Sequence, residues 1–359
     1  MYNVDKEKLR GVEMKKLICI ILALAITAAL PFSAFALTLD SGIEALKAEF
    51  VQAEGPVAGG YSVDYSYFSP VKENDTVKYP LVIWFHGMGD GSEPGAPVKK
   101  SNVAYWASDE FQARFDPAGG AFILAMRSRE ENGIYWGDAM LEPVRAAVDE
   151  FIAANKANID LSRIYAGGYS MGGKMTLKTA VAYPEMFAAI FPICPAWSPS
   201  TDLTALIADI PVWLISGKSD PLVNYHLSVT PTWEKIIEES NVAGECRFSS
   251  LAKVCYPDGS RTSSSHHAWF AVNYDLFSIE NGDYPHMSTV DGNGNSVELV
   301  YPEGMIAWLS AHTSDYDGVP GNGKGNITDD METENLFPAE NITYFLKNVF
   351  AKFLALLPC

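Results

Sequence analysis

Cysteine and histidine are scarce in this sequence, and they are not spaced as metal ligands usually are. The 359 residues include five cysteines and six histidines. Because there is no Cys-x-x-Cys pair and no histidine-rich run, we expect no metal site, and nothing else in the sequence calls for a cofactor. There is also no internal repeat, which excludes a repeat architecture.

Positive charge is in the minority. Lysine and arginine together number 26 against 44 acidic residues, which gives a formal net charge of −18. An acidic surface repels nucleic acid and anionic lipid, so we expect neither as a partner of the main domain. The simplest interpretation of this charge is solubility outside the cell.

The sequence has no apolar run long enough for a comfortable transmembrane helix. Two lysines precede an apolar run from Leu17 to Leu30, and a small-x-small cleavage site follows at Ser33–Ala36. This pattern is typical of a secretory signal peptide, with a retained anchor as the alternative. We therefore predict a signal peptide over residues 1–36, with Met14 as a candidate start, and a secreted or extracellular protein.

Cleavage would leave four of the five cysteines, namely Cys194, Cys246, Cys255 and Cys359. Exported chains can keep disulfides. We expect Cys246 and Cys255 to pair because they are close in sequence. Four thiols allow three complete pairings, so the connectivity stays open.

Short β-branched or aromatic runs alternate with helical stretches from about residue 80 to 313. We predict strands at Leu81–Phe85, Ala121–Met126, Arg163–Ala166, Phe187–Ile193, Val212–Ser216 and Cys246–Tyr256. We predict helices at Glu142–Ala157, Met171–Tyr183, Trp233–Glu239 and Glu303–Ala311. This alternation indicates an α/β fold, a mostly parallel sheet with helices on both faces, within a domain of residues 37–313.

Two segments depart from that alternation. Tyr274–Val300 is rich in glycine, asparagine and aspartate, and we expect a hairpin turn at Asp291–Asn295. Residues 314–359 begin as an acidic, glycine-rich linker and end in an amphipathic helix over Ile342–Leu357. We favour packing of this helix on the main domain over contact with a membrane or partner.

The strongest catalytic motif is Gly168-Tyr169-Ser170-Met171-Gly172, which follows a predicted strand and opens a predicted helix. A serine hydroxyl is a poor nucleophile unless it is exposed, oriented and paired with a base. A tight strand-to-helix turn exposes the hydroxyl, and it leaves no room for side chains two positions before and after the serine. We therefore predict that Ser170 is the nucleophile of a serine hydrolase.

A glycine-rich turn, His86-Gly87-Met88-Gly89, ends the first strong strand. Such a loop supplies one backbone N–H to the oxyanion hole, and the residue after the nucleophile supplies the other. We assign the hole to the N–H groups of Met171 and Met88, with Gly87 as the alternative to Met88. His86 itself is expected to be structural.

The predicted acid is Asp220, just past the carboxyl end of a predicted strand, where sheets of this kind build their sites. Its role would be to hold the tautomer of a histidine and to stabilise the imidazolium. Asp202 and Asp209 are alternatives that flank the preceding helix. The other interpretation of Asp220 is a simple turn cap.

The predicted base must follow the acid in the chain. His226 follows Asp220 too closely to come from a new strand, and His312 ends the closing helix. His266 and His267 lie in a loop after a predicted strand. Spacing alone leaves both open, because neighbouring loop residues can point either way.

Four stretches resemble the secreted esterase and predicted-peptidase branch of the α/β-hydrolases, which includes feruloyl esterase, acetylxylan esterase and polyhydroxybutyrate depolymerase-like proteins. They are YPLVIWFHGMGDG, IDLSRIYAGGYSMGGKMTLKTAVAYPEMFAAIFPIC, IPVWLISGKSDPLV and SHHAW, within roughly Tyr79–Thr313. In that branch the catalytic histidine tends to stand three positions before a tryptophan, as His266 stands before Trp269. The resemblance therefore implies a triad of Ser170, Asp220 and His266. The chain departs from the branch at His267 and in the added segment before the last helix.

Several aromatic residues are candidates for the walls of the substrate pocket, although such residues pack in protein cores about as often. They are Tyr135, Trp136, Trp197 and Trp269.

Together these features predict a cofactor-free enzyme that cleaves carboxylic esters through an acyl-enzyme intermediate. The resemblance and the signal peptide favour acyl or feruloyl esters, of small molecules or of polysaccharide, as substrates. One rival is a serine peptidase of the prolyl-oligopeptidase type. The other is a non-catalytic binding protein that keeps the fold.

Overall fold

The structure is a computed structural model, and it describes residues 43–101, 103–130, 135–255, 262–273, 275, 278–279, 282–283, 287–299 and 304–318. The predicted signal peptide, Cys359 and the predicted C-terminal helix lie outside these residues, as does most of the predicted linker. The chain divides into two units, 1–44 and 45–359, and the strands and helices named below belong to the second. No helix within the described ranges is both long and apolar enough to cross a bilayer.

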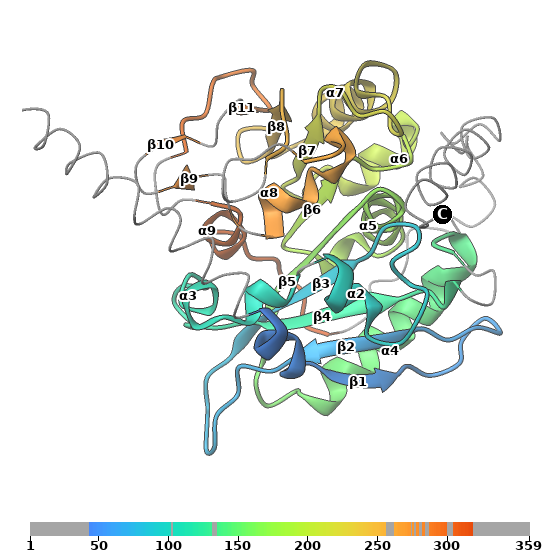
Figure 1. The fold of residues 1–359 in the computed structure, drawn as a ribbon, viewed down its shortest axis with the longest axis vertical. Helices are drawn as coiled ribbons and strands as arrows, with labels where there is room; N and C mark the ends of the chain where they lie inside the picture. Colours follow the sequence, from blue (N-terminus) through green and yellow to red (C-terminus); the bar gives the residue numbers. More distant parts are fainter. Residues whose placement is uncertain are drawn as a thin grey trace, which may run out of the picture. The chain divides into compact units, whose positions relative to one another are not determined.

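A nine-stranded sheet runs through the second unit in the spatial order β1-β2-β4-β3-β5-β6-β7-β8-β11 (Figure 1). Neighbours from β4 to β8 are parallel, while β1, β2 and β11 pair antiparallel at the two edges. The strands are β1 (Val51–Glu54), β2 (Asp64–Phe68), β3 (Tyr79–Phe85), β4 (Phe122–Arg127), β5 (Ile159–Tyr169), β6 (Ala189–Ile193), β7 (Trp213–Gly217), β8 (Arg247–Leu251) and β11 (Met287–Asp291). The short strands β9 (Ser278–Ile279) and β10 (Gly282–Asp283) pair with each other.

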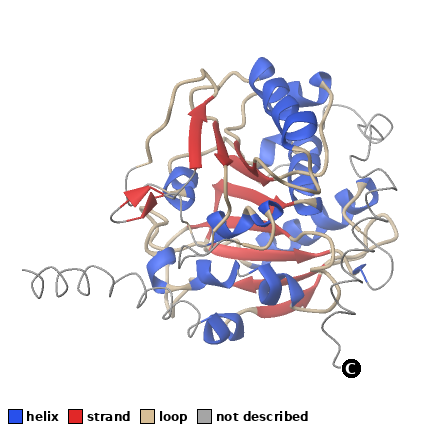
Figure 2. Cartoon of the chain, turned by 45° about the horizontal axis from the view of Figure 1, so that its top comes forward, coloured by secondary structure: helices blue, strands red, loops and turns tan. Residues whose placement is uncertain are grey.

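Helices flank this sheet (Figure 2). They are α2 (Ala96–Ser101), α3 (Asp109–Gln112), α4 (Leu141–Ala154), α5 (Met171–Ala182), α6 (Thr201–Thr204), α7 (Thr230–Glu239), α8 (Trp269–Asn273) and α9 (Met305–Ser310). The predicted helices are confirmed as α4, α5, α7 and α9, with ends that differ by a few residues. The fold class is the predicted one, a mostly parallel sheet between helices.

The central strands β3 and β4 are apolar except for Arg127 at the end of β4, because helices cover both of their faces. Every residue of β3 and of β4 is buried, as expected for parallel strands with two covered faces. All six predicted strands are confirmed, as β3 to β8, although β5 is longer than predicted and β8 is shorter.

Three outer strands of the sheet were not predicted, namely the edge strands β1 and β11 and the strand β2 next to β1. β1 is mostly exposed and β2 half-exposed, so neither carries a continuous apolar run. β11 belongs to the segment interpreted as an insertion, and it extends the sheet by pairing with β8. The predicted turn after β11 is confirmed, because the N–H of Asp291 donates to the carbonyl of Asn295 at 2.9 Å.

The predicted disulfide between Cys246 and Cys255 is wrong. Both cysteines are buried and no bond joins them. Cys246 directly precedes β8 and Cys255 follows it, so the strand separates them by roughly 17 Å at about 3.3 Å per residue. A disulfide needs Cα atoms within about 7 Å of each other.

The direction of the chain changes at β3, which lies between β4 on one side and β5 on the other. The loop after β3 leads towards β4, and the turn after β5 leads towards β6. Two parallel strands whose connections leave in opposite directions open a crevice at their carboxyl ends. The ends are aligned there, because Phe85 of β3 pairs with Gly168 of β5.

Two glycines allow the turn after β5 to pack directly on the end of β3. A Cβ atom at Gly168 or at Gly172 would overlap the carbonyl oxygen of Phe85. That oxygen belongs to the backbone of a buried central strand, so it cannot move aside. The two glycines of the Ser170 motif are therefore required by close packing of two backbones.

We expect Gly172→Ala to lower the free energy of unfolding by about 1–3 kcal/mol, because the added methyl group has no space. Gly137→Ala is the matched control, since a Cβ there meets no atom within 4 Å. Thermal or urea unfolding of the two variants measures the difference. Equal stability of both variants would contradict the packing described here.

Candidate active site

Ser170 is the single residue between the end of β5 and the start of α5. Its φ of 58° lies in the left-handed region, which is strained for a residue with a side chain. The N–H of Ser170 donates to the carbonyl of Ile193 at 2.9 Å, and its carbonyl accepts from the N–H of Ala196 at 3.0 Å. These bonds fix the strained turn to the end of β6.

Met171 is the first residue of α5, and its N–H lies at the positive end of the helix dipole. The first N–H groups of a helix have no acceptor within the helix. The predicted oxyanion donor is therefore available to negative charge that develops next to Ser170.

Asp220 lies three residues after the end of β7, and its carboxylate is oriented by several hydrogen bonds. Oδ1 accepts from the N–H groups of Leu222 at 2.8 Å and Val223 at 3.0 Å. Oδ2 lies 2.8 Å from Nδ1 of His266, and the Asp220 side chain is fully buried. The carboxylate is thus held in the position that an orienting acid requires.

His266, and not His267, is the histidine that the structure brings to Asp220. The two residues share a short 3-10 turn, in which Ser264 Oγ accepts from the N–H of His266 at 3.2 Å. The Nδ1 atom of His267 is buried and has no hydrogen-bond partner among the described residues. Of the two histidines that sequence spacing leaves open, His266 is therefore the one hydrogen-bonded to Asp220.

Cys194 connects the serine turn with the histidine. It directly follows Ile193, which accepts the Ser170 N–H, and its Sγ lies 3.6 Å from the carbonyl oxygen of His266. In the described part of the chain no hydrogen bond joins Ser170 Oγ to His266. Catalytic hydrogen bonds are often long in ligand-free sites and tighten when substrate binds.

Cys194, Asp220 and His266 also form the one group of potential metal ligands found within the described ranges, with their ligand atoms within 4.8 Å of one another. Asp220 and His266 already satisfy each other by a hydrogen bond. Burial raises the pKa of the Cys194 thiol, so at pH 7 it carries no charge to attract a cation.

The pKa of His266 is set by opposing effects. Burial lowers it, but interactions with the neighbouring Cys194 and Asp220 outweigh burial and raise the pKa above the usual 6.5. Because the Cys194 thiol is neutral at pH 7, we assign the increase to Asp220. The carboxylate stabilises the imidazolium that forms when His266 accepts a proton.

The glycine-rich loop after β3, residues His86 to Gly91, is called the oxyanion loop here. His86 is fully buried, and its Nε2 accepts from the N–H of Ser128 at 3.2 Å. Burial lowers the pKa of His86 to about 4, so the ring is neutral. His86 is structural, as predicted.

The oxyanion loop has two backbone N–H groups without an acceptor among the described residues, those of Gly87 and Met88. The N–H groups of Gly89 and Gly91 donate to Glu130, and that of Asp90 donates to the carbonyl of Gly87. Met88 and its alternative Gly87 are thus both available as donors.

Among the predicted wall residues Tyr135 is exposed, whereas Trp136, Trp197 and Trp269 are all buried. Trp136 is 2% exposed and donates from Nε1 to the carbonyl of His86 at 2.9 Å, so it supports the oxyanion loop. Trp197 is also buried, beneath the ammonium group of Lys178. Trp269 stacks on Phe270 and lies beside Tyr169, next to the nucleophile. Of the three tryptophans, Trp269 is the one beside the serine turn.

A cavity of about 370 Å³ lies beside the Asp220–His266 pair. Its lining is small and rich in hydroxyl groups, and consists of Ser219, Pro221, Thr262, Ser263, Ser264 and Ser265. A polar lining without charged residues suits a neutral, hydroxylated ligand.

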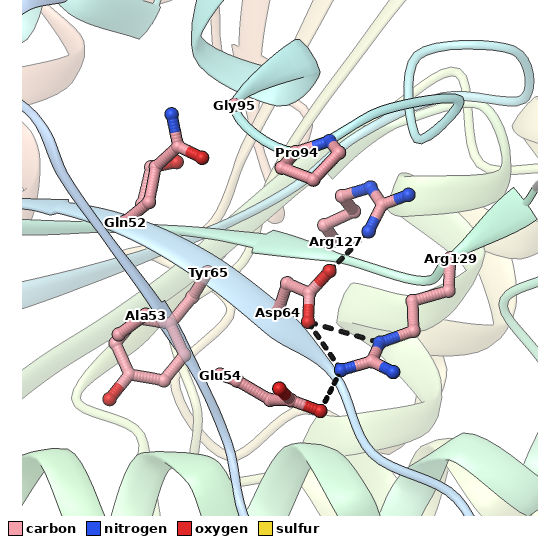
Figure 3. Close-up of a pocket in the computed structure, with 10 residues that line it drawn as sticks. Gln52, Ala53, Glu54, Asp64, Tyr65, Pro94, Gly95, Arg127 and Arg129 are labelled. Carbon is pink, nitrogen blue, oxygen red and sulfur yellow. Dashed lines mark hydrogen bonds and ion pairs between the residues drawn. The ribbon is translucent and has the colours of Figure 1, made fainter.

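A second cavity of similar volume lies among β1, β2 and β4 (Figure 3). Asp64 pairs there with both Arg127 and Arg129, and Glu54 pairs with Arg129. Its lining includes no member of the predicted triad. Since its charged groups pair with one another, we interpret this cavity as a structural ion-pair cluster.

Sequence reasoning missed several residues of the site. Cys194 was considered only as a disulfide partner, and Glu130 was not considered at all. Glu130 lies three residues after the end of β4, just as Asp220 lies three residues after the end of β7. The same rule, an acidic residue just past the end of a strand, could therefore have identified Glu130 in the sequence. Asp90, whose carboxylate accepts a hydrogen bond from the hydroxyl of Tyr169, had no such signal.

Comparisons with known proteins agree with this arrangement. A family model described as "Phospholipase/Carboxylesterase" matches residues 125–254. The chain is 37% identical over 144 residues to "Putative esterase NocK" of Nocardia uniformis subsp. tsuyamanensis, a match that covers 40% of each protein. It is 21% identical over 251 residues to "Bifunctional acetylxylan esterase/xylanase XynS20E" of Neocallimastix patriciarum, which covers 69% of this chain and 34% of that protein. The matches therefore span well under half the length of either curated relative.

A solved structure described as "Crystal Structure of a Thermostable Esterase" has the same fold. It superimposes with a TM-score of 0.52 at 24% identity, over 64% of this chain and 61% of that chain. From the sheet order, the serine turn after β5 and these matches, we conclude that the chain has the α/β-hydrolase fold.

Proposed function

We propose that this protein hydrolyses carboxylic esters through an acyl-enzyme intermediate on Ser170. The observation that carries the proposal is the buried hydrogen bond of 2.8 Å between His266 Nδ1 and Asp220 Oδ2, beside a serine in a strained strand-to-helix turn. The matches to esterases support the same reaction class.

In the proposed mechanism, Ser170 Oγ attacks the carbonyl carbon of the ester while His266 Nε2 accepts the hydroxyl proton. Asp220 stabilises the imidazolium, and the N–H groups of Met171 and Met88 bind the oxyanion of the tetrahedral intermediate. Collapse of the intermediate releases the alcohol, which takes its proton from His266. Water then attacks the acyl-enzyme by the same steps and yields the free acid.

We further propose an exported enzyme acting on acyl or feruloyl esters of small molecules or polysaccharide. The hydroxyl-lined cavity beside Asp220 and His266 offers hydrogen bonds to a polyol alcohol group. The half-exposed Met88 provides apolar surface on the oxyanion loop. One relative described as an acetylxylan esterase and xylanase supports the polysaccharide class, and the predicted signal peptide supports export.

We expect Ser170→Ala to lower kcat for p-nitrophenyl acetate by at least about 10³-fold, because no other group supplies the attacking oxygen. Ser69→Ala, at an exposed loop position, is the matched control and should keep the wild-type rate. Steady-state kinetics with p-nitrophenyl acetate, methyl ferulate and a proline anilide make the comparison. Wild-type turnover by Ser170→Ala would contradict the mechanism, and faster cleavage of the anilide than of either ester would favour the peptidase.

We expect the rate constant kcat/KM to rise with pH through the raised pKa of His266, at a pH above 6.5, because only the neutral imidazole accepts the serine proton. Asp220→Asn removes the stabilising charge, so the midpoint should move to lower pH and kcat should fall by about 10⁴-fold. Proton NMR of the His266 ring follows the same midpoint in the less active variant. An unchanged midpoint in Asp220→Asn would show that Asp220 does not set this pKa.

A further inference from the structure

We propose that Glu130 is a positioning residue for the oxyanion hole. Its carboxylate would bind the oxyanion loop from outside and so keep the Met88 N–H directed at the reacting carbonyl. This inference rests on the proposed ester hydrolysis, because it assigns a role within the oxyanion hole of that reaction. Glu130 itself touches no reacting atom.

The carboxylate of Glu130 accepts the two loop N–H groups that flank Asp90. The N–H of Gly89 donates to Oε1 at 2.9 Å and to Oε2 at 2.8 Å. The N–H of Gly91 donates to Oε2 at 3.2 Å. Hydrogen bonds from N–H groups to an ionised carboxylate are about twice as strong as those between neutral groups.

The sheet brings Glu130 to this loop from a distant part of the sequence. Glu130 lies three residues past the end of β4, and the oxyanion loop begins at the end of β3. β3 and β4 are parallel neighbours whose carboxyl ends are aligned, with Phe85 paired to Met126. The Glu130 side chain is only 8% exposed, so water competes little for its oxygens.

Other contacts also bind the oxyanion loop, but they bind its carbonyl groups and the Asp90 side chain and not its N–H groups. Lys100 Nζ donates to the carbonyl of Gly89 at 2.6 Å, and Arg127 Nε donates to the carbonyl of Gly91 at 2.9 Å. The hydroxyl of Tyr169 bonds the side chain of Asp90. Within the described residues, Glu130 is thus the acceptor for both N–H groups, while lysine and arginine bind carbonyls.

The N–H groups that Glu130 binds are not available to the substrate, so its contacts determine which loop N–H groups remain as donors. Glu130 occupies the N–H groups of Gly89 and Gly91, so those of Gly87 and Met88 are left without a protein acceptor in the described structure. Gly89 has a φ of 89°, a left-handed conformation that reverses the chain directly after Met88. The Glu130 carboxylate binds Gly89 at this reversal. It thereby fixes the direction in which the N–H of the preceding Met88 points.

A buried carboxylate next to a site for an oxyanion must itself be compensated. Lys100 supplies positive charge close to Glu130, while the carboxylate of Asp90 opposes it. The ring of His86, 3.8 Å from Glu130, is neutral because burial lowers its pKa. Burial raises the pKa of Glu130, and Lys100, which reaches the same loop from α2, offsets part of this effect.

A residue that only positions an oxyanion donor should affect the transition state more than substrate binding, because the bond to the carbonyl oxygen strengthens as charge develops. Loss of one such donor costs about 10²–10³-fold in kcat. Misplacement of the donor should cost part of that factor. The expected signature is therefore a lower kcat with a nearly unchanged KM.

The test compares Glu130→Gln and Glu130→Ala with the matched control Glu73→Gln, an exposed carboxylate in the loop that precedes β3. Glutamine keeps the shape of the side chain, but it is neutral, and in either orientation its NH2 group faces the N–H of Gly89 and replaces an acceptor. We expect kcat for p-nitrophenyl acetate to fall by about 10–100-fold in Glu130→Gln. We expect at least as large a loss in Glu130→Ala, with KM within about twofold of wild type in both.

Binding of a trifluoromethyl ketone separates positioning from a merely structural role. This inhibitor adds to the catalytic serine and forms an oxyanion, so its inhibition constant should rise in parallel with the loss of kcat/KM. Melting temperatures show which variants remain folded, and the near-isosteric Glu130→Gln keeps the test valid if Glu130→Ala does not fold.

Wild-type kcat in a folded Glu130→Gln or Glu130→Ala would overturn the role of Glu130, as would lost kcat with unchanged binding of the ketone. Failure of this inference is distinguishable from failure of the proposed function. An active wild type with an inactive Ser170→Ala and fully active Glu130 variants refutes only the role of Glu130. A wild type without esterase activity refutes both.

Discussion

The close contact between the end of β3 and the turn after β5 is the constraint on which the candidate site depends. Gly168 and Gly172 let the backbone around Ser170 approach the Phe85 carbonyl, and the hydrogen bond from Ser170 to Ile193 secures the other side of the turn. The contact places the serine next to the oxyanion loop, which starts one residue after Phe85. It also forces Ser170 into a left-handed conformation, and the central sheet has to hold that strain.

The charged groups of the site are buried, so hydrogen bonds must satisfy each of them. An isolated carboxylate buried like that of Asp220 would be costly, but two backbone N–H groups and the His266 imidazole satisfy it. The same logic applies to Glu130, which two loop N–H groups and the nearby Lys100 compensate. We thus propose separate roles for two buried carboxylates, one behind the catalytic base and one behind the oxyanion loop.

The central strands and the serine turn could be predicted because their signals are local. Continuous apolar runs indicate strands covered on both faces, and glycines at fixed spacing around a serine indicate the tight turn. The outer strands β1, β2 and β11 carry no such run, because they are partly exposed and are held in the sheet by pairing with their neighbours. The predicted disulfide between Cys246 and Cys255 was wrong because it relied on nearness in sequence, and an extended strand separates the two residues. Glu130 and Cys194 could not be predicted as site residues, because they reach the site only through the alignment of strand ends that are far apart in the sequence. No local pattern encodes that alignment.

The central claim is that Ser170, His266, Asp220 and the oxyanion loop converge on one reacting carbon. A crystal structure of the enzyme inactivated by an alkyl fluorophosphonate tests it most directly, because the bound phosphonate mimics the tetrahedral intermediate. The account predicts phosphorus bonded to Ser170 Oγ, the phosphoryl oxygen within about 3 Å of the Met171 and Met88 nitrogens, and His266 still bonded to Asp220. Phosphorus on another residue, or a phosphoryl oxygen directed away from both N–H groups, would contradict it.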